Sequence, residues 1–353
     1  MKVLAVTNGL PSAKNPRNGT FIEQQIKGLR DIGLRVEVIL IDRANGGSIA
    51  YRKARQVVRK HLVNYKQDVV HVMYGGVMAD LVTMETSNLP TVVSFCGVDL
   101  LGANYGPLSY RLRTRIGTLA SYRSARRADG IVVKSRNLEK GLPSDVNRSF
   151  VSIIPNGVCL NRFSPRNREE CRLRLDWPKD KFHVLFSTTD RKDAKKRLPL
   201  AESAVDLLKA RGVRIEMHGL SNTPHDEVPI WLNAADVLLL TSMYDEGSPN
   251  IVKEALACNR PVVSVDVGDV KERISGVDGC FLAEPNPNDI ADKLFHVYLG
   301  PRVVCARDRM RKLSLERVAK RLALVYKKTI RRFEEKMCKS VVSKAKASHP
   351  PST

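Results

Sequence analysis

The stretch Val237-Leu-Leu-Leu-Thr-Ser-Met-Tyr-Asp-Glu246-Gly-Ser-Pro-Asn-Ile-Val-Lys-Glu254 decides the fold of this chain. It opens with a run of large apolar residues that is typical of a buried strand. Ser248 is a good N-cap, and Pro249 is a good first residue of a helix. A second apolar run, Val262-Val-Ser-Val265, follows. This order predicts a strand, a loop, a helix over about 249–258 and another strand, which together make a βαβ unit.

Two carboxylates flank the start of that helix. Glu246 lies in the loop, and Glu254 lies about one and a half turns into the helix. In a parallel sheet, ligands bind beyond the carboxyl ends of the strands, where the free N–H groups and the dipole of a helix favour phosphate. The two glutamates are therefore placed to hold two different parts of one ligand. For the bare spacing alone, the alternative interpretation is two solvated glutamates around an ordinary helix.

Strands alternate with helices in both halves of the chain. In the first half the predicted strands are 2–7, 36–41, 68–73, 91–95 and 130–134, with helices over 20–33 and about 50–65. In the second half the predicted strands are 183–187, 213–217, 237–241, 262–265 and 281–283, with helices near 197–211, at 287–299 and after Ser314. Such alternation predicts parallel sheets that are covered by helices on both faces. With 353 residues, the chain is long for one domain and comfortable for two.

The composition argues against several classes of protein. Hydrophobic residues make up 43% of the chain, which is enough for ordinary cores. No apolar run reaches the ~18–20 residues of a membrane span, and the first residues are typical of a strand, not of a signal peptide. The seven cysteines form no C-x-x-C pair, so we expect reduced thiols, a cytoplasmic location and no zinc site.

The chain is strongly basic, with a formal net charge of +22. Such an excess favours nucleic acid, anionic lipid or anionic substrates, without choosing among them. The charge is concentrated in residues 104–136 and 302–346. A nucleic-acid-binding protein is therefore one alternative, and it predicts aromatic residues interleaved with basic ones. Aromatic residues are only 6% of the chain and no such motif is present, so we expect no nucleic-acid partner.

The E-x7-E spacing, followed by Ala-Leu-Ala-Cys258 and a strand that begins after Pro261, resembles the retaining glycosyltransferases of family 4. The segment Pro155-Asn-Gly-Val158, followed by Phe163 and Pro165, is similar to the interdomain crossing of that family. The resemblance implies the GT-B fold, in which two Rossmann-like domains with parallel sheets face each other across a cleft. The implied organisation is an acceptor domain over 1–155, a donor domain over 160–312, a terminal helix over about 315–335 that crosses back to the first domain, and a disordered basic tail over 337–353.

The resemblance also implies roles for the opening stretch. In the family, the residue corresponding to Glu254 contacts the nucleotide ribose, and the one corresponding to Glu246 contacts the hydroxyls of the donor sugar. The residues between them contact the sugar and the phosphates. In this chain these are Gly247, Ser248, Pro249, Asn250 and Ile251.

The donor diphosphate needs positive charge. Family members provide it with an arginine and a lysine in an R-x4-K spacing, which Arg191 and Lys196 match, with Lys195 as a close rival. Where the family commonly has glycine after the lysine, this chain has Arg197. Two cations at a diphosphate would stabilise the charge of the leaving group, so we expect no metal and no cofactor beyond the nucleotide-sugar co-substrate.

Further candidate residues lie in the first half. Gly19, between the first strand and the first helix, allows a close approach of the backbone to a phosphate or a sugar. Many family members carry His-Gly-x-Asp after the fourth strand, whereas this chain has Cys96-Gly-Val-Asp99. Cysteine cannot serve as the same proton-shuttling group at neutral pH, and the motif resembles a subgroup similar to teichuronic-acid biosynthesis enzymes. Asp99 is a candidate catalytic residue that either orients this loop or meets the acceptor, and a structural cap is the alternative.

Two histidines and one loop complete the set. His71 follows a run of valines, and we expect it to be a buried strand residue and not a catalyst. His218, at the end of a predicted strand, faces the donor cleft if that strand is read correctly. The loop over 222–228, which ends at Val228, is the candidate pocket for the nucleotide base.

These features predict a retaining glycosyltransferase. We expect it to move a sugar from a nucleotide-diphosphate sugar to a hydroxyl of a glycan or lipid-linked acceptor in cell-envelope polysaccharide synthesis. The basic surface predicts peripheral attachment to an anionic membrane, on the inner face of the cell membrane. A sugar-nucleotide epimerase of the same fold is an alternative, although such enzymes normally lack this E-x7-E context.

Overall fold

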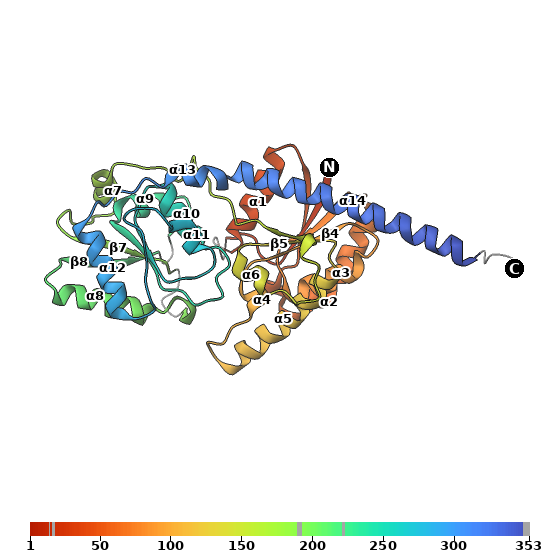
Figure 1. The fold of residues 1–353 in the computed structure, drawn as a ribbon, viewed down its shortest axis with the longest axis horizontal. Helices are drawn as coiled ribbons and strands as arrows, with labels where there is room; N and C mark the ends of the chain where they lie inside the picture. Colours follow the sequence, from red (N-terminus) through yellow and green to blue (C-terminus); the bar gives the residue numbers. More distant parts are fainter. Residues whose placement is uncertain (14, 16–17, 189–192, 221–222, 349–353) are drawn as a thin grey trace.

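In the computed structural model of this chain, two α/β domains lie side by side, and a long helix runs along one of them (Figure 1). The structure describes residues 1–13, 15, 18–188, 193–220 and 223–348. The predicted architecture of two parallel sheets covered by helices is confirmed, and every predicted strand is present with bounds within two residues of those expected.

The first sheet has six parallel strands in the order β2-β1-β3-β4-β5-β6. The strands are β1 (Lys2–Thr7), β2 (Arg35–Leu40), β3 (Val69–Val72), β4 (Thr91–Phe95), β5 (Gly130–Val133) and β6 (Val151–Ile153). The helices are α1 (Thr20–Asp31), α2 (Arg43–Asn64), α3 (Gly76–Glu85), α4 (Val98–Leu101), α5 (Leu108–Arg127) and α6 (Arg136–Lys140), with a 3-10 turn η1 (Arg148–Phe150). β3, β4 and β5 are buried along their whole length, which explains their continuous apolar runs.

The second sheet has five parallel strands in the order β11-β10-β9-β7-β8. The strands are β7 (Phe182–Phe186), β8 (Ile215–Gly219), β9 (Val237–Leu240), β10 (Val262–Ser264) and β11 (Phe281–Leu282). The helices are α7 (Arg168–Arg174), α8 (Leu198–Ala210), α9 (Val228–Ala234), α10 (Asn250–Ala257), α11 (Val270–Ile274), α12 (Pro287–Leu299) and α13 (Arg307–Met310), with 3-10 turns η2 (Ala194–Lys196) and η3 (Arg311–Leu313).

Alternate residues of the second sheet build two separate cores. Leu238 and Leu240 pack with residues of α9 and α10, whereas Val237 and Leu239 pack with residues of α8 and α12. This division follows from the two-residue period of a strand, which sends successive side chains to opposite faces. The carboxyl end of β9 is thereby fixed between two covered faces, and the loop that carries Glu246 leaves from that end.

The final helix, α14 (Leu315–Ser348), packs along α1 of the first domain and extends past it (Figure 1). Val318, Leu322 and Tyr326 are buried against the first sheet at four-residue spacing, as one face of a helix requires. Ser314 caps the helix, because its Oγ accepts the backbone N–H of Arg317 at 3.3 Å.

The C-terminal segment differs from our prediction. We predicted a disordered segment over 337–353, but α14 continues without a break to Ser348. The segment is rich in lysine and alanine, which are good helix formers, and each added residue extends a helix that the buried part has already nucleated. Residues 349–353 lie outside the described residues.

Candidate active site

Helix α10 begins one residue later than the sequence predicted. Pro249 has an extended backbone conformation and occupies the N-cap position without a capping side chain, so the expected N-cap role of Ser248 is wrong. The Oγ of Ser248 instead accepts a hydrogen bond from Nζ of Lys253, at 2.6 Å. Lys253 is fully buried, and burial lowers its pKa to about 8, so its ammonium requires such a partner. The first N–H groups of α10 have no capping side chain, and Asn250 borders both of the cavities described below.

The carboxylate of Glu246 faces two lysines. Its Oε1 lies 2.7 Å from Nζ of Lys196, and its Oε2 lies 3.6 Å from Nζ of Lys195. Burial alone would raise the pKa of Glu246, but the two ammonium groups and hydrogen bonds from Lys196 and Ser242 lower it to about 2. Glu246 is therefore ionised at neutral pH and is a very weak base.

The loop of the lysines is anchored by Arg197. This residue has a left-handed backbone conformation with φ 50°, a conformation that favours glycine, the residue that the family resemblance implies here. Its guanidinium donates to the carbonyl oxygens of Thr241 and Ser242, at 2.5 and 2.9 Å. These two bonds tie the loop to the carboxyl end of β9 and keep the lysines beside Glu246. Arg191, the other predicted phosphate ligand, lies outside the described residues.

Glu254 lies at the other end of the site and contacts His225. The distance from Oε1 of Glu254 to Nε2 of His225 is 3.1 Å. Nδ1 of the same ring lies 2.8 Å from Nη1 of Arg162 and 3.4 Å from Nε2 of Gln24. His225 therefore links the first domain and the segment between the domains to Glu254 of the second domain.

Two cavities meet at the start of α10. One, of about 200 Å³, is bordered by Glu254, His225, Leu220, Val228, Asn250 and Ile251, together with Thr20, Ser187 and Thr188. The other, also of about 200 Å³, is bordered by Phe21, Tyr74, residues 96–98, Asn156, Lys195 and residues 246–250. Asn250 borders both cavities. The structure thus places Glu246, Glu254, the predicted residues 247–251 and Val228 around two adjoining cavities, which form one line from Glu254 to Glu246.

Gly19 lies on the first domain at the edge of this line. It precedes α1 with φ 67°, and a Cβ there would come 2.3 Å from the carbonyl oxygen of Gly9. Only glycine fits such a crossing of two backbones. Gly19 and Gly9 border a third cavity, of about 400 Å³, which shares Phe21 and Tyr74 with the second one.

The two domains touch where the Cys96 loop meets the Glu246 loop. A Cβ on Gly97 would come 2.5 Å from the carbonyl oxygen of Asp245, and a Cβ on Gly247 would come 2.0 Å from that of Cys96. The hydroxyl of Tyr105 also donates to Oδ2 of Asp245, at 2.8 Å. The cleft is therefore closed beside Glu246 by direct backbone contact.

The carboxylate of Asp99 is hydrogen-bonded to the backbone of this loop. It accepts the backbone N–H groups of Gly75, Cys96 and Gly97 at distances between 2.7 and 3.1 Å. Asp99 is only 5% exposed, and these contacts support the loop-orienting role that was one of its two predicted alternatives. Burial raises the pKa of the Cys96 thiol to about 12, so this group stays protonated at neutral pH and cannot act as a base.

Neither candidate histidine reaches the cleft. His71 is buried, and its two ring nitrogens pair with Tyr326 at 2.7 Å and Ser94 at 2.8 Å, as expected for a structural residue. His218 was expected to face the donor, and this is wrong. Its ring stacks on Trp177 with centroids 3.6 Å apart, on the face of the sheet that α7 and α9 cover.

The sequence analysis missed His225 as an individual residue. It lies in the 222–228 loop that we expected near the nucleotide base, but only the fold brings its ring to Glu254. His225 is followed by two acidic residues in a polar loop, and nothing in this spacing marks it as a partner of α10, which begins ten residues after the end of β9.

Comparison with known proteins identifies the class of enzyme. Residues 188–299 match the protein family described as Glycosyl transferases group 1. The chain is 24% identical, over 335 residues, to TuaC of Bacillus subtilis, a glycosyltransferase assigned to teichuronic acid biosynthesis; the match covers 76% of this chain and 82% of TuaC.

Two solved structures share the whole fold. The sucrose-phosphate synthase of Thermosynechococcus elongatus superposes with a TM-score of 0.72 at 16% identity, covering 93% of this chain and 99% of that one. Anabaena HepE in complex with UDP-glucose superposes with a TM-score of 0.58 at 15% identity, covering 97% of this chain and all of HepE (100%).

Two parallel-sheet domains that meet at a shared cleft define the GT-B fold. The chain is a glycosyltransferase of this fold, and its residues 188–299 are similar to the Glycosyl transferases group 1 family.

Proposed function

We propose that this enzyme transfers a sugar from a nucleotide-diphosphate sugar to a hydroxyl of a glycan or lipid-linked acceptor, with retention of the anomeric configuration. The observation that supports this best is the line from Glu254 through the start of α10 to Glu246, bordered throughout by cavity. A donor along this line would meet Glu254 with its ribose, the N–H groups of α10 with its phosphates and Glu246 with its sugar hydroxyls.

The lysines of the site would carry the charge of the leaving group. As the bond between the anomeric carbon and the phosphate oxygen breaks, its electron pair goes to the diphosphate, beside Lys195 and Lys196. The acceptor hydroxyl attacks the anomeric carbon from the same face and passes its proton to the departing phosphate oxygen. Glu246 does not attack the sugar in this scheme, because its low pKa and its pairing with Lys196 make it a poor base and nucleophile.

Lys195 and Lys196 also reduce the need for a metal ion in the proposed reaction. Two ammonium groups beside the diphosphate provide the charge that Mg²⁺ provides in other sugar transferases. Arg191, on the same loop, is the third candidate cation by the family pattern. We therefore propose that transfer proceeds without a divalent ion, and that addition of a chelator leaves the rate unchanged.

The nucleotide is the first property to test. HepE was solved with UDP-glucose, so UDP and UDP-glucose lead a panel that also contains GDP, ADP and their sugars. The melting temperature of the chain is measured with each ligand, for the wild type and for Glu254→Gln. We expect one nucleotide to raise the melting temperature and the variant to lose most of that rise. If no nucleotide stabilises the wild type, the proposed donor site is wrong.

The acceptor side is marked by an exposed apolar stripe on α5. The stripe consists of Leu108, Leu112, Ile116 and Leu119, whose exposed fractions lie between 52% and 78%. Their spacing of four, four and three residues places them on one face of the helix. Arg111 and Arg115 lie along the same face, and among the described residues neither forms an ion pair. A helix with an apolar stripe beside unpaired arginines is the pattern of a segment that lies on an anionic membrane.

We therefore propose that α5 rests on a membrane surface that presents the acceptor. Among the helices of the described residues, none is long and apolar enough to cross a bilayer. A peripheral contact through α5 fits a lipid-linked glycan of the cell envelope, and the similar protein TuaC is named for teichuronic acid biosynthesis. A function in cell-envelope polysaccharide synthesis follows from that acceptor.

A further inference from the structure

Three side chains with metal-ligating atoms share one face of the second sheet, away from the cleft. In the register of β7 and β8, His183 lies opposite Glu216, and His218 is two residues further along β8. Because side chains of a strand alternate, Glu216 and His218 point to the same side as each other. Their candidate ligand atoms and that of His183 all lie within 4.8 Å of one another.

The imidazole of His183 is oriented by its surroundings. Its Nε2 lies 2.6 Å from the carbonyl oxygen of Pro178, which can only accept, so this nitrogen carries the proton. Nδ1 therefore holds a lone pair, and it points at Nε2 of His218, at 2.9 Å. A histidine that donates one ring N–H to a backbone carbonyl and turns the other nitrogen inward is the usual arrangement of a metal ligand.

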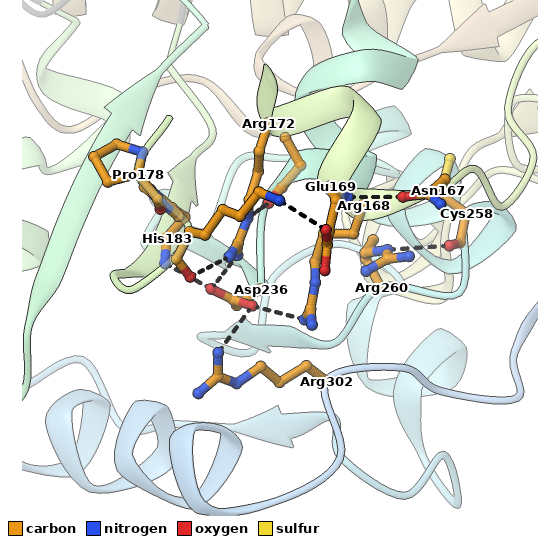
Figure 2. Close-up of polar contacts among 12 residues, drawn as sticks. Asn167, Arg168, Glu169, Arg172, Pro178, His183, Asp236, Cys258, Arg260 and Arg302 are labelled. Atoms are coloured by element: carbon orange, nitrogen blue, oxygen red, sulfur yellow. Dashed lines mark hydrogen bonds and ion pairs between the residues drawn. The ribbon is translucent and has the colours of Figure 1, made fainter. Parts of the chain in front are cut away.

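The backbone at this position is also fixed. The N–H of His183 donates to Oδ2 of Asp236 at 2.7 Å, and Asp236 is in turn held by Arg168, Arg172 and Arg302 (Figure 2). On the other side, the ring of Trp177 stacks against that of His218. The two imidazoles are therefore held in place before any ion binds.

We propose that His183, Glu216 and His218 form a binding site for Zn²⁺ that is separate from the transfer site, and that the cysteine pattern, from which we expected no zinc site, does not reveal it. Two imidazole nitrogens and one carboxylate are a common protein ligand set for Zn²⁺, with the fourth position left to water. Both Glu216 and His218 are partly exposed, so solvent has access to that position. None of the three residues borders either cleft cavity.

Binding needs only small rearrangements. Ligand atoms around a tetrahedral zinc lie about 3.4 Å apart, given zinc–ligand distances of roughly 2.0–2.2 Å. The His183–His218 distance is already close to this, and the carboxylate of Glu216 has to move inward. At present Glu216 pairs with Lys181 at 3.0 Å, and both side chains are more than a third exposed. Such exposed pairs contribute little stability, so exchange of Lys181 for zinc is favourable. The hydrogen bond between the two imidazoles is replaced by two bonds to the metal.

The ion would stabilise one edge of the donor domain. β8 is the edge strand of its sheet and pairs with β7 alone. A zinc ion bound by one residue of β7 and two of β8 would join the two strands through side chains as well as backbone. The melting temperature of the chain should therefore rise with the zinc concentration.

Zinc binding is measured on the full chain without a histidine tag, after treatment with a chelator and its removal. A chromogenic chelator competes for Zn²⁺, and Co²⁺ serves as a spectroscopic probe of a tetrahedral site. We expect one equivalent per chain and a change in the fluorescence of Trp177. Glu216→Gln and His218→Asn should each weaken binding by more than the roughly 10–100-fold that loss of an outer partner costs.

Two matched variants sharpen the test. Lys181→Ala removes the competitor of zinc for Glu216 and should tighten binding, whereas His296→Asn, an exposed histidine on α12, should leave it unchanged. Circular dichroism establishes that each variant is folded, and if His218→Asn is not, Glu216→Gln and Lys181→Ala decide with opposite signs. The proposal is overturned if the wild type binds no more zinc than Glu216→Gln, or if Lys181→Ala binds it no more tightly.

Discussion

The ammonium of Lys196 lies 2.7 Å from the carboxylate of Glu246, so the two residues neutralise each other at the centre of the cleft. In the proposed mechanism a donor must part this pair, because its diphosphate would pair with the lysine and its sugar hydroxyls would bind the carboxylate. In that mechanism, each partner is held in a half-buried position by the other until the donor replaces it. Because the donor would have to replace both partners, substitutions at Lys196 and Glu246 test the proposed chemistry most directly.

Lys196→Ala should lower the rate of sugar transfer by about 10²-fold or more, because it removes a cation from the developing charge of the leaving group. Lys196→Arg should retain part of the activity. The measurement is the initial rate of transfer from the donor identified by the nucleotide panel. Lys209→Ala, which removes an exposed lysine on α8 that pairs with Asp206, is the control and should act as wild type. Full activity of Lys196→Ala would remove this lysine from the mechanism.

The pKa of Glu246 predicts how stability depends on pH. The pKa falls from an ordinary value of 4.5 in the unfolded chain to about 2 in the folded one. The group therefore stabilises the fold fully above pH 4.5, and this contribution is lost as the pH falls towards 2. It is on the order of 3 kcal/mol at neutral pH.

Urea unfolding of the wild type and of Glu246→Gln at several pH values measures this effect. The wild type should be the more stable protein at pH 6, and the difference should shrink steadily below pH 4.5. A difference that stays constant down to pH 3 would mean that the lysines do not hold the carboxylate ionised.

Arg197 combines an unfavourable backbone with favourable side-chain bonds. A left-handed conformation costs a non-glycine residue about 1 kcal/mol, and the bonds to Thr241 and Ser242 offset this. Arg197→Gly loses the bonds but relieves the strain, whereas Arg197→Ala loses the bonds and keeps the strain. We expect the order of stability to be wild type, then glycine, then alanine, with alanine about 1 kcal/mol below glycine in urea unfolding. Equal stability of the two variants would show that the left-handed conformation is not retained.

The region around α10 shows how much of the local structure can be predicted from the sequence. The apolar runs, the loop and the stop after the helix predicted β9, α10 and β10 to within a residue or two, because burial and turn chemistry are local properties. The N-cap was wrong by one position, because Ser248 is engaged by Lys253, a residue one turn into the helix. The capping preference of serine does not predict this hydrogen bond with Lys253.

The second sheet shows a different limit. Strand β8 was placed two residues too early, and nothing in its sequence says which face of the sheet His218 meets. That face depends on the register with β7, which is a long-range property. The contact between His225 and Glu254 likewise depends on how a loop folds across a helix. The sequence analysis therefore missed His225 and misplaced His218, whose contacts depend on tertiary structure. It located the helix and strands of the local β9–α10–β10 motif.

Glu254 and Glu246 should differ in kinetics. If Glu254 binds the ribose, which does not react, Glu254→Gln weakens the ground state and the transition state alike. It should then raise the KM for the donor by roughly 10–100-fold, as expected for a hydrogen bond to a charged group, with a smaller change in kcat. Glu246→Gln, next to the reacting sugar, should act mainly on kcat. Steady-state kinetics with varied donor separates the two, and the reverse assignment would follow if the two patterns were exchanged.

The stripe on α5 predicts binding to anionic membranes. Replacing Leu108, Leu112, Ile116 and Leu119 by serine should abolish co-sedimentation with vesicles that contain phosphatidylglycerol, because the apolar side chains provide the insertion and the arginines provide the attraction. The wild type should bind such vesicles at physiological salt and bind neutral vesicles much less, since each basic residue near the surface adds about 1 kcal/mol.

The matched control for the stripe is Leu173→Ser combined with Leu299→Ser. These two leucines are also highly exposed, at 80% and 68%, but they lie on the donor domain. The control should bind vesicles as the wild type does. Binding of the wild type that is equal for anionic and neutral vesicles, or that survives the loss of all four stripe residues, would exclude α5 as the membrane contact.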